Sequence, residues 1–73
     1  MSKADKMLLE QGFEKTEIKA LREGVVRIRY EGGFGSSIAF EQNLKRFYTS
    51  FSYIDIDLWL AINEKMKELG WFD

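Results

Sequence analysis

The 73-residue sequence contains no cysteine, no histidine and no proline. Without cysteine there are no disulfide bridges and no thiolate chemistry, and without histidine the usual proton shuttle at neutral pH and the commonest transition-metal ligand are missing. No nucleophile–base pair can be assigned among the remaining residue types, and so small a domain has little room for a ligand cavity of about 300 Å³. We therefore expect a protein that is not an enzyme and that binds no cofactor or metal.

An excess of charge of one sign and long apolar segments are also missing. The chain has 11 Lys and Arg against 12 Asp and Glu, for a formal net charge of −1. This balance predicts neither a nucleic-acid binder nor a membrane-surface binder. The longest apolar run, residues 58–62, is far shorter than the roughly 20 residues of a membrane span. The first six residues have no apolar secretion signal, so we expect a cytoplasmic protein without membrane contact.

The residues that are present predict one small globular domain over residues 1–73. Hydrophobic residues make up 45% of the chain and aromatic residues 15%. A chain of this length buries only about 60% of the surface that its unfolded state exposes, so its stability is expected to be modest. The aromatic rings, each able to bury about 150–250 Å², partly compensate for the small core.

The two ends of the chain have helical patterns, over residues 3–11 and 56–69. Each predicted helix has an N-capping side chain before it and a left-handed glycine after it, namely Ser2 with Gly12 and Asp55 with Gly70. Asp5 is placed to complete a capping box with Ser2. We interpret Asp55 and Asp57 as helix-terminal carboxylates rather than as a metal-binding pair, because no third acid is close in sequence.

Between the helices the hydrophobic period changes to two, which is typical of strands with one buried face. The predicted strands are residues 14–21, 25–31, 37–41 and 46–53, of which the first has the weakest pattern. The turns are residues 21–24, 32–35 and 42–45, the last with Asn43 as the residue best suited to positive φ. Connections this short predict antiparallel neighbours. The predicted fold class is α+β: an antiparallel β-meander of three to four strands with N- and C-terminal helices packed on one face.

In this arrangement one face of the sheet and one stripe of each helix form the core, and the other face of the sheet is wet. The predicted core residues are Leu8, Ile18, Val26, Ile28, Ile38, Phe40, Phe47, Phe51, Leu58, Ile62, Met66 and Leu69. Trp59 lies on the flank of the helical stripe.

Parts of both helices resemble a known group of proteins. The opening Met-Ser-Lys-Ala-Asp-Lys-Met of residues 1–7, the Gly12-Phe13 pair and the close Ile-Asn-Glu-Lys-Met-Lys-Glu-Leu-Gly-Trp of residues 62–71 carry the resemblance. They resemble short uncharacterised proteins of Gram-positive bacteria and their phages and prophages. The resemblance covers about a third of the chain and implies a prophage-type accessory protein, with no catalytic or binding residues carried over. The chain departs from the group at residues 58–60, where apolar residues replace acidic ones.

A candidate protein-contact surface includes Leu60, Trp71 and Phe72. Leu60 lies about 160° around the helix from Ile62 and therefore faces away from the predicted core. Together with the two C-terminal aromatic residues it would form an exposed apolar patch. In the alternative interpretation Trp71 and Phe72 only cap the core. The favoured function is a protein-interaction module that binds another protein or its own copy as a homodimer.

The alternative function is weak binding of single-stranded nucleic acid on the exposed face of the sheet. The candidate contacts are Lys19, Arg27, Arg29 and Tyr48. A basic sheet with an aromatic ring is typical of platforms on which bases stack. Cross-strand ion pairs, such as Glu17 with Arg29 and Arg27 with Glu41, would equally explain a solvated face. The overall acidity makes a nucleic-acid partner the less favoured interpretation.

The glycine-rich segment 32–35 lies between two strand patterns, which favours a hairpin turn over a phosphate-binding loop. Phe34 stands at the tip of this turn. It is either an incidental turn residue or an exposed anchor.

Overall fold

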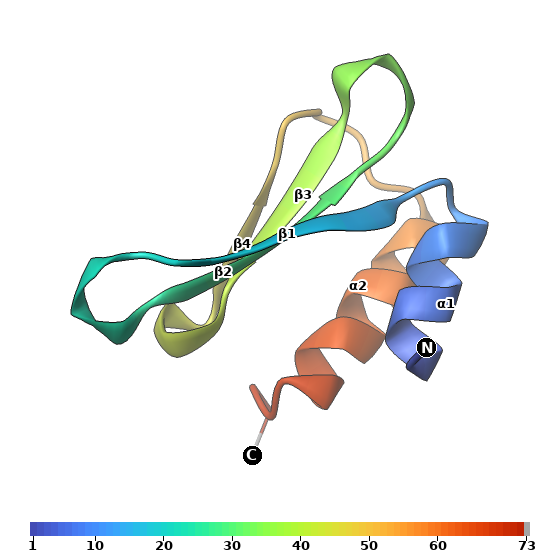
Figure 1. Cartoon of the computed structure of the whole chain (residues 1–73). Helices are drawn as coiled ribbons and strands as arrows, with labels where there is room; N and C mark the ends of the chain where they lie inside the picture. Colours follow the sequence, from blue (N-terminus) through green and yellow to red (C-terminus); the bar gives the residue numbers. More distant parts are fainter. Residues whose placement is uncertain (73) are drawn as a thin grey trace.

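The structure, a computed structural model, describes residues 1–72 and has the predicted α+β fold (Figure 1). Its elements are α1 (Lys3–Glu10), β1 (Glu14–Ala20), β2 (Val26–Glu31), β3 (Ser37–Glu41), β4 (Arg46–Thr49) and α2 (Ile56–Glu68). The strands form one antiparallel sheet in the order β1-β2-β3-β4. Both helices lie side by side on the same face of this sheet (Figure 1).

The ends of both helices follow the predicted capping. The hydroxyl of Ser2 accepts a hydrogen bond from the amide of Asp5 at 3.1 Å, and the carboxylate of Asp55 accepts one from the amide of Leu58 at 2.9 Å. Gly12 and Gly70 have φ angles of 89° and 77°, as a left-handed C-terminal cap requires. The prediction of a capping box is wrong, because the carboxylate of Asp5 accepts a hydrogen bond from the hydroxyl of Tyr30 instead.

The core lies between the inner face of the sheet and the two helices. Its largest fully buried side chains are Tyr30, Phe40, Leu8, Ile38 and Ile62. The predicted core residues Val26, Phe47, Phe51 and Leu69 are partly buried and pack against it. Tyr30 was not among the predicted core residues, although it follows Val26 and Ile28 in the alternation of β2. Its ring meets that of Phe40 edge-on at 5.7 Å, which makes the pair a centre of the packing.

The prediction that Ile18 belongs to the core is wrong. Ile18 pairs with Ile28 in the sheet and so points to the inner face, but 64% of its surface is exposed. The reason is geometric: the outer half of β1 extends beyond the two helices, which therefore do not cover it (Figure 1). All seven residues of β1 are exposed.

The outer face of the sheet is less exposed to solvent than predicted. Ala39 and Glu41 of β3 are 2% and 7% exposed although they point away from the helices. Ala39 is small and lies between Arg29 and Tyr48, whose longer side chains cover it. The last strand also ends earlier than predicted, at Thr49. Phe51 nevertheless reaches the core, where its ring stacks on Phe13 at 5.7 Å.

The three turns lie at the predicted positions. The backbone of the turn after β3 differs from the prediction. In the turn after β3 the positive φ of 52° belongs to Lys45, not to Asn43. The side chain of Asn43 donates a hydrogen bond at 2.6 Å to the carbonyl oxygen of Gly24, in the turn after β1. Asn43 therefore connects two neighbouring turns at one end of the sheet.

Candidate functional site

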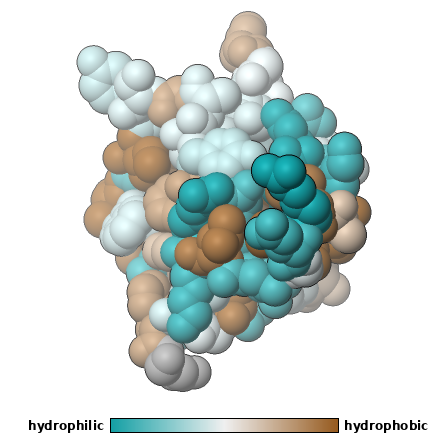
Figure 2. Space-filling model, turned by 90° about the vertical axis from the view of Figure 1, so that its left-hand side faces the viewer, coloured by the Kyte–Doolittle hydropathy of each residue, from teal (hydrophilic) through white to brown (hydrophobic). Residues whose placement is uncertain are grey.

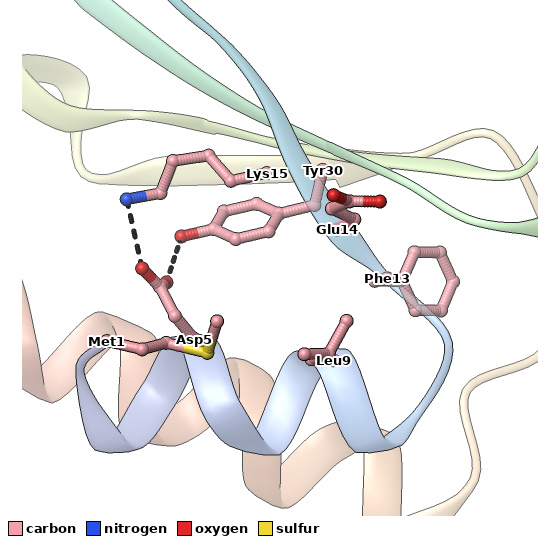
Figure 3. A pocket seen from close by; sticks show the side chains of 7 residues that line it. All are labelled: Met1, Asp5, Leu9, Phe13, Glu14, Lys15 and Tyr30. Carbon is pink, nitrogen blue, oxygen red and sulfur yellow. Dashed lines mark hydrogen bonds and ion pairs between the residues drawn. The ribbon is translucent and has the colours of Figure 1, made fainter.

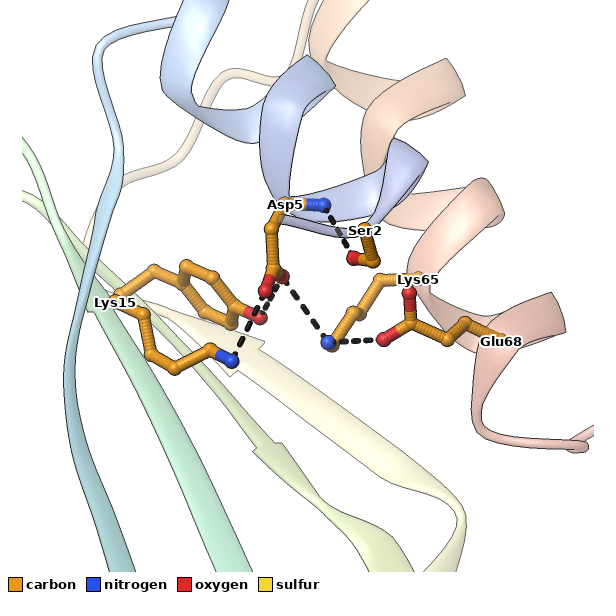
Figure 4. A network of polar contacts seen from close by, with 6 residues as sticks. Ser2, Asp5, Lys15, Lys65 and Glu68 are labelled. Carbon is orange, nitrogen blue, oxygen red and sulfur yellow. Dashed lines mark hydrogen bonds and ion pairs between the residues drawn. The ribbon is translucent and has the colours of Figure 1, made fainter.

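A polar network joins both helices to the sheet, with Asp5 at its centre (Figure 4). One carboxylate oxygen of Asp5 accepts hydrogen bonds from the hydroxyl of Tyr30 and, at 3.1 Å, from the ammonium of Lys65. The other oxygen forms an ion pair with Lys15 at 2.9 Å. Lys65 also pairs with Glu68, and its ammonium lies 5.6 Å from the centroid of the Tyr30 ring. The side chain of Lys65 is only 3% exposed, so these partners satisfy a buried cation.

The protonation states of Asp5, Tyr30 and Glu68 are fixed at neutral pH. Burial by itself raises the pKa of Asp5, but the hydrogen bonds from Tyr30, Lys15 and Lys65 outweigh it and lower the pKa to about 2. Burial and the hydrogen bond to Asp5 raise the pKa of Tyr30. Burial likewise works against ionisation of Glu68, yet the contact with Lys65 lowers its pKa. Groups shifted away from neutrality in these directions exchange no proton near pH 7, so the network is suited to holding the fold together.

An open pocket of about 310 Å³ lies beside this network (Figure 3). Its lining combines apolar side chains with members of the network, namely Met1, Asp5, Leu9, Phe13, Glu14, Lys15 and Tyr30. The carboxylate of Asp5 contacts both the hydroxyl of Tyr30 and the ammonium of Lys15, so these three side chains are engaged with one another.

A wider pocket of about 550 Å³ lies where the turn after β1 approaches the turn after β3. It is lined by Leu21, Arg22, Glu23, Val25, Glu41, Leu44 and Arg46. Arg46 forms an ion pair with Glu41 across its wall. Both charges of that pair are thus neutralised within the chain.

At the opposite end of the sheet, the turn after β2 and the segment after β4 contain no charged residue. The two longest uncharged segments of the sequence, residues 32–40 and 47–54, meet there. Ser50 connects them: its amide donates to the carbonyl of Ser37 at 3.1 Å, and its hydroxyl accepts from the amide of Ser37 at 2.8 Å. The surface formed by residues 32–37 and 50–54 is hereafter called the uncharged end. Its most exposed aromatic side chains are those of Phe34 and Tyr53, at 111% and 90%.

Phe34 occupies an unfavourable position in the turn after β2. The amide of Ser36 donates to the carbonyl of Gly33 at 3.1 Å, and the two central residues, Phe34 and Gly35, have φ angles of 57° and 73°. Two positive φ angles define a type I′ turn, whose first central position favours Asn, Asp or Gly. A bulky side chain at positive φ is an outlier. Full exposure means that the phenyl ring gains no packing within the chain to offset this cost.

The candidate nucleic-acid contacts do lie together on the outer face of the sheet. Lys19 is opposite Arg27, and Arg29 and Tyr48 flank Ala39. The end of the molecule with the turns after β1 and β3, on the left of Figure 1, shows hydrophilic side chains around separate hydrophobic areas (Figure 2).

Acidic residues share this outer face at the predicted positions. Glu17 lies opposite Arg29 and Glu41 opposite Arg27, which confirms the predicted cross-strand partners. The ion pair that forms is diagonal, from Arg27 to Glu17 at 3.1 Å, and this contact raises the pKa of Arg27. The Nε atoms of Arg27 and Arg29 are covered and make no hydrogen bond within residues 1–72. They are therefore not accessible to a phosphate group.

The candidate protein-contact residues do not form one patch. Leu60 is 48% exposed and shares the outer side of α2 with Ile56 and Trp59. Trp71 is partly buried, with its ring 6.1 Å from that of Phe40, so it caps the core. Phe72 is 57% exposed, but it lies past the C-terminal end of α2, which is itself about 12 Å along the helix axis from Leu60.

The structure of residues 1–72 supports neither a metal site nor a membrane span. No cluster of three or more acidic side chains is placed to hold a metal ion in this part of the chain. Neither helix in these residues has the length and apolar character needed to cross a membrane.

Sequence analysis missed the polar network and the uncharged end. The network joins residues up to 60 positions apart, so no local pattern identifies it. The uncharged end did leave a trace in the sequence, because its two segments are the longest stretches without Asp, Glu, Lys or Arg. Only the pairing of β3 with β4 shows that they are neighbours.

Comparisons of this chain with models of protein families, with curated proteins and with solved structures find no match.

Proposed function

We propose that this chain is a non-enzymatic protein-interaction module that binds another protein through its uncharged end, with Phe34 as the anchor. The observation that carries the proposal is the fully exposed phenyl ring of Phe34 on a backbone with φ of 57°. Such a residue costs stability and contributes no internal contact, and unfavourable backbone conformations of this kind concentrate at functional sites. A pocket on a partner protein would supply the missing contacts.

The composition of the uncharged end supports a protein partner. Its two segments consist mainly of Gly, Ser and aromatic residues, in the order Gly-Gly-Phe-Gly-Ser-Ser and Ser-Phe-Ser-Tyr-Ile. Antigen-binding loops use the same combination, in which rigid aromatic rings supply contact area and small polar residues supply adaptable hydrogen bonds. The lack of charge also removes the cost of desolvating ions on binding.

Exposed apolar residues continue from the uncharged end onto α2. Ile56, Trp59 and Leu60 are 66%, 41% and 48% exposed, and they follow Tyr53 and Ile54 in the chain with Asp55 and Asp57 in between. Leu60, selected from the sequence as a contact residue, is thus part of an apolar strip on α2 that these two carboxylates interrupt. This strip is additional exposed apolar surface on the same molecule.

The setting that we propose for this interaction is a bacteriophage or prophage. It rests on the resemblance of residues 1–7 and 62–71 to short phage proteins. The apolar residues 58–60 that replace acidic ones belong in part to the strip just described. This difference fits a contact surface that other members of the group do not share.

The test compares two substitutions that have the same effect on the backbone. Phe34→Asn places the favoured residue in the turn after β2, and Glu23→Asn does so in the turn after β1, where Glu23 has a φ of 63°. Each variant and the wild-type chain are immobilised and exposed to lysate of a Gram-positive host, and retained proteins are quantified. We expect a protein that the wild type and Glu23→Asn retain and Phe34→Asn loses, with the purified protein binding in the same order in calorimetry. Equal retention by both variants would refute the role of Phe34.

The alternative function, binding of single-stranded nucleic acid, has one observation in its favour: Lys19, Arg27, Arg29 and Tyr48 share one face of the sheet. The acids opposite them count against it. We therefore keep it as the second proposal.

A further inference from the structure

We propose that the free edge of β1 pairs with β1 of a second copy, in an antiparallel register centred on Ile18, to give a symmetric dimer with one continuous sheet. This inference concerns a surface other than the uncharged end and does not depend on the proposed function. β1 is an edge strand of the sheet, and its outer half extends beyond the helices (Figure 1). Edge strands carry a row of backbone groups available for pairing with another chain.

The backbone of β1 fixes which residues face a second copy. The amide of Leu21 donates to the carbonyl of Val25 at 2.7 Å, so the amide of Leu21 points toward β2. Backbone groups alternate along an antiparallel strand. Those of Ile18 and Ala20 therefore point away from β2, toward the free edge. A two-fold axis at Ile18 places these groups opposite their equivalents, with Ile18 facing Ile18 of the second copy.

Charge selects this register over its neighbours. With Ile18 at the centre, Glu17 lies opposite Lys19 of the second copy, and the symmetry forms this unlike pair twice. Moving the centre to Glu17 places two glutamates face to face, and moving it to Lys19 places two lysines face to face. Like charges directly opposite one another are destabilising, whereas unlike charges attract. The charged side chains that protect the edge from other strands thus favour a second copy of the same strand.

Two side chains in the single chain lack contacts that the dimer would supply. Lys19 lies opposite Arg27, a like charge, and forms no ion pair with the described residues. Ile18 faces the core side of the sheet but remains 64% exposed. Pairing gives Lys19 an acidic partner and gives each Ile18 an apolar neighbour from the other copy.

The experiment is sedimentation equilibrium of the full chain from about 10 µM to about 1 mM, a range suited to a small interface. We expect the wild-type mass to rise from 8.6 kDa toward twice that value. Lys19→Glu should remain monomeric, because it places like charges opposite each other twice. It should still fold, because it creates an unlike pair with Arg27. Adding Glu17→Lys to Lys19→Glu exchanges the charges, and the double variant should dimerise again.

Ile18→Lys and Ile56→Lys provide a matched comparison, since the two isoleucines are 64% and 66% exposed. Ile18→Lys should abolish the dimer, whereas Ile56→Lys and Phe34→Asn should retain it. A wild-type chain that stays monomeric at 1 mM would overturn the inference. It would also be overturned by dimerisation of Lys19→Glu, by failure of the charge exchange to restore the dimer, or by loss of the dimer in Phe34→Asn.

Discussion

The hydroxyl of Tyr30, on β2, donates a hydrogen bond to the carboxylate of Asp5, on α1, and so joins the N-terminal helix to a fully buried aromatic residue of the sheet. Because the acceptor is a carboxylate, this hydrogen bond is strongest while Asp5 is ionised. The position of α1 on the sheet is therefore linked to the charge of one carboxylate.

Acid should weaken the fold partly through Asp5. Its pKa is about 2 in the folded chain against 3.8 for an unperturbed aspartate. A carboxylate with a depressed pKa stabilises the fold above its unfolded pKa, and this contribution is lost as the pH falls through the folded pKa. We expect Asp5→Asn to reduce the free energy of unfolding by about 1–2 kcal/mol at pH 7, and by progressively less between pH 4 and pH 2. Urea unfolding across this range measures the difference, with exposed Glu10→Gln as the control.

Replacing Lys65 by Met should be more costly than replacing a surface lysine on the same helix. Lys65 is 3% exposed and neutralises both Asp5 and Glu68, so its loss leaves these acids with fewer partners. We expect Lys65→Met to cost about 2–4 kcal/mol and Lys67→Met, with a side chain 60% exposed, to cost less than about 0.5 kcal/mol. In combination with Asp5→Asn the cost should fall below the sum of the single changes. Additive free energies in denaturant titrations would contradict the network.

Two aromatic residues of similar size should respond very differently to truncation. Phe40 is fully buried, so Phe40→Ala should cost about 3–5 kcal/mol. Trp59, which sequence analysis treated as a flank residue of the core, is 41% exposed, and Trp59→Ala should cost less than about 1.5 kcal/mol. Chemical denaturation of both variants provides the comparison. Equal costs for Phe40→Ala and Trp59→Ala would mean that Trp59, on the outer side of α2, is buried.

The turn after β2 should become more stable when its anchor is removed. Phe34→Asn supplies the residue that a type I′ turn favours, and we expect a gain of about 1 kcal/mol, or roughly 4–8 °C in Tm. Glu23→Asn should produce a gain of the same sign in the turn after β1, because Glu23 also has a positive φ. Differential scanning calorimetry tests both. A loss of stability in Phe34→Asn would show that the phenyl ring has contacts within the fold.

Single-stranded oligonucleotides should not bind the outer face of the sheet. At about 50 mM salt, where non-specific binding of a true binder is strong, we expect no anisotropy change of a labelled oligonucleotide up to high micromolar protein. The net charge is −1, and Glu17 and Glu41 lie opposite the arginines. Binding that falls steeply with salt and weakens in Tyr48→Ala would favour the nucleic-acid function instead.

Local patterns in the sequence were sufficient to predict the elements and the order of the sheet. Alternation placed Ile38 and Phe40 inside, and the capping residues Ser2 and Asp55 marked where the helices begin. These features depend on residues a few positions apart. Because every connection is short, the same local information also determined which strands are neighbours.

The features that could not be predicted from the sequence depend on how far each element extends in space. Ile18 alternates like a core residue, and only the limited reach of the helices over β1 explains its exposure. Lys65 looks like a surface cation in the helical pattern, yet partners from α1 and its own helix allow it to be buried. The exposed ring of Phe34 could be placed at a turn tip, but its positive φ could not.

The contact between Asp5 and Lys65 also has a consequence for the order in which the protein is made. The two residues are 60 positions apart, and α2 is the last element of the fold. On the ribosome, the hairpins of the sheet emerge and can pair well before the second helix exists. During that interval the rings of Tyr30 and Phe40 lack the cover that α2 provides, so the nascent chain presents an open aromatic surface until α2 is complete.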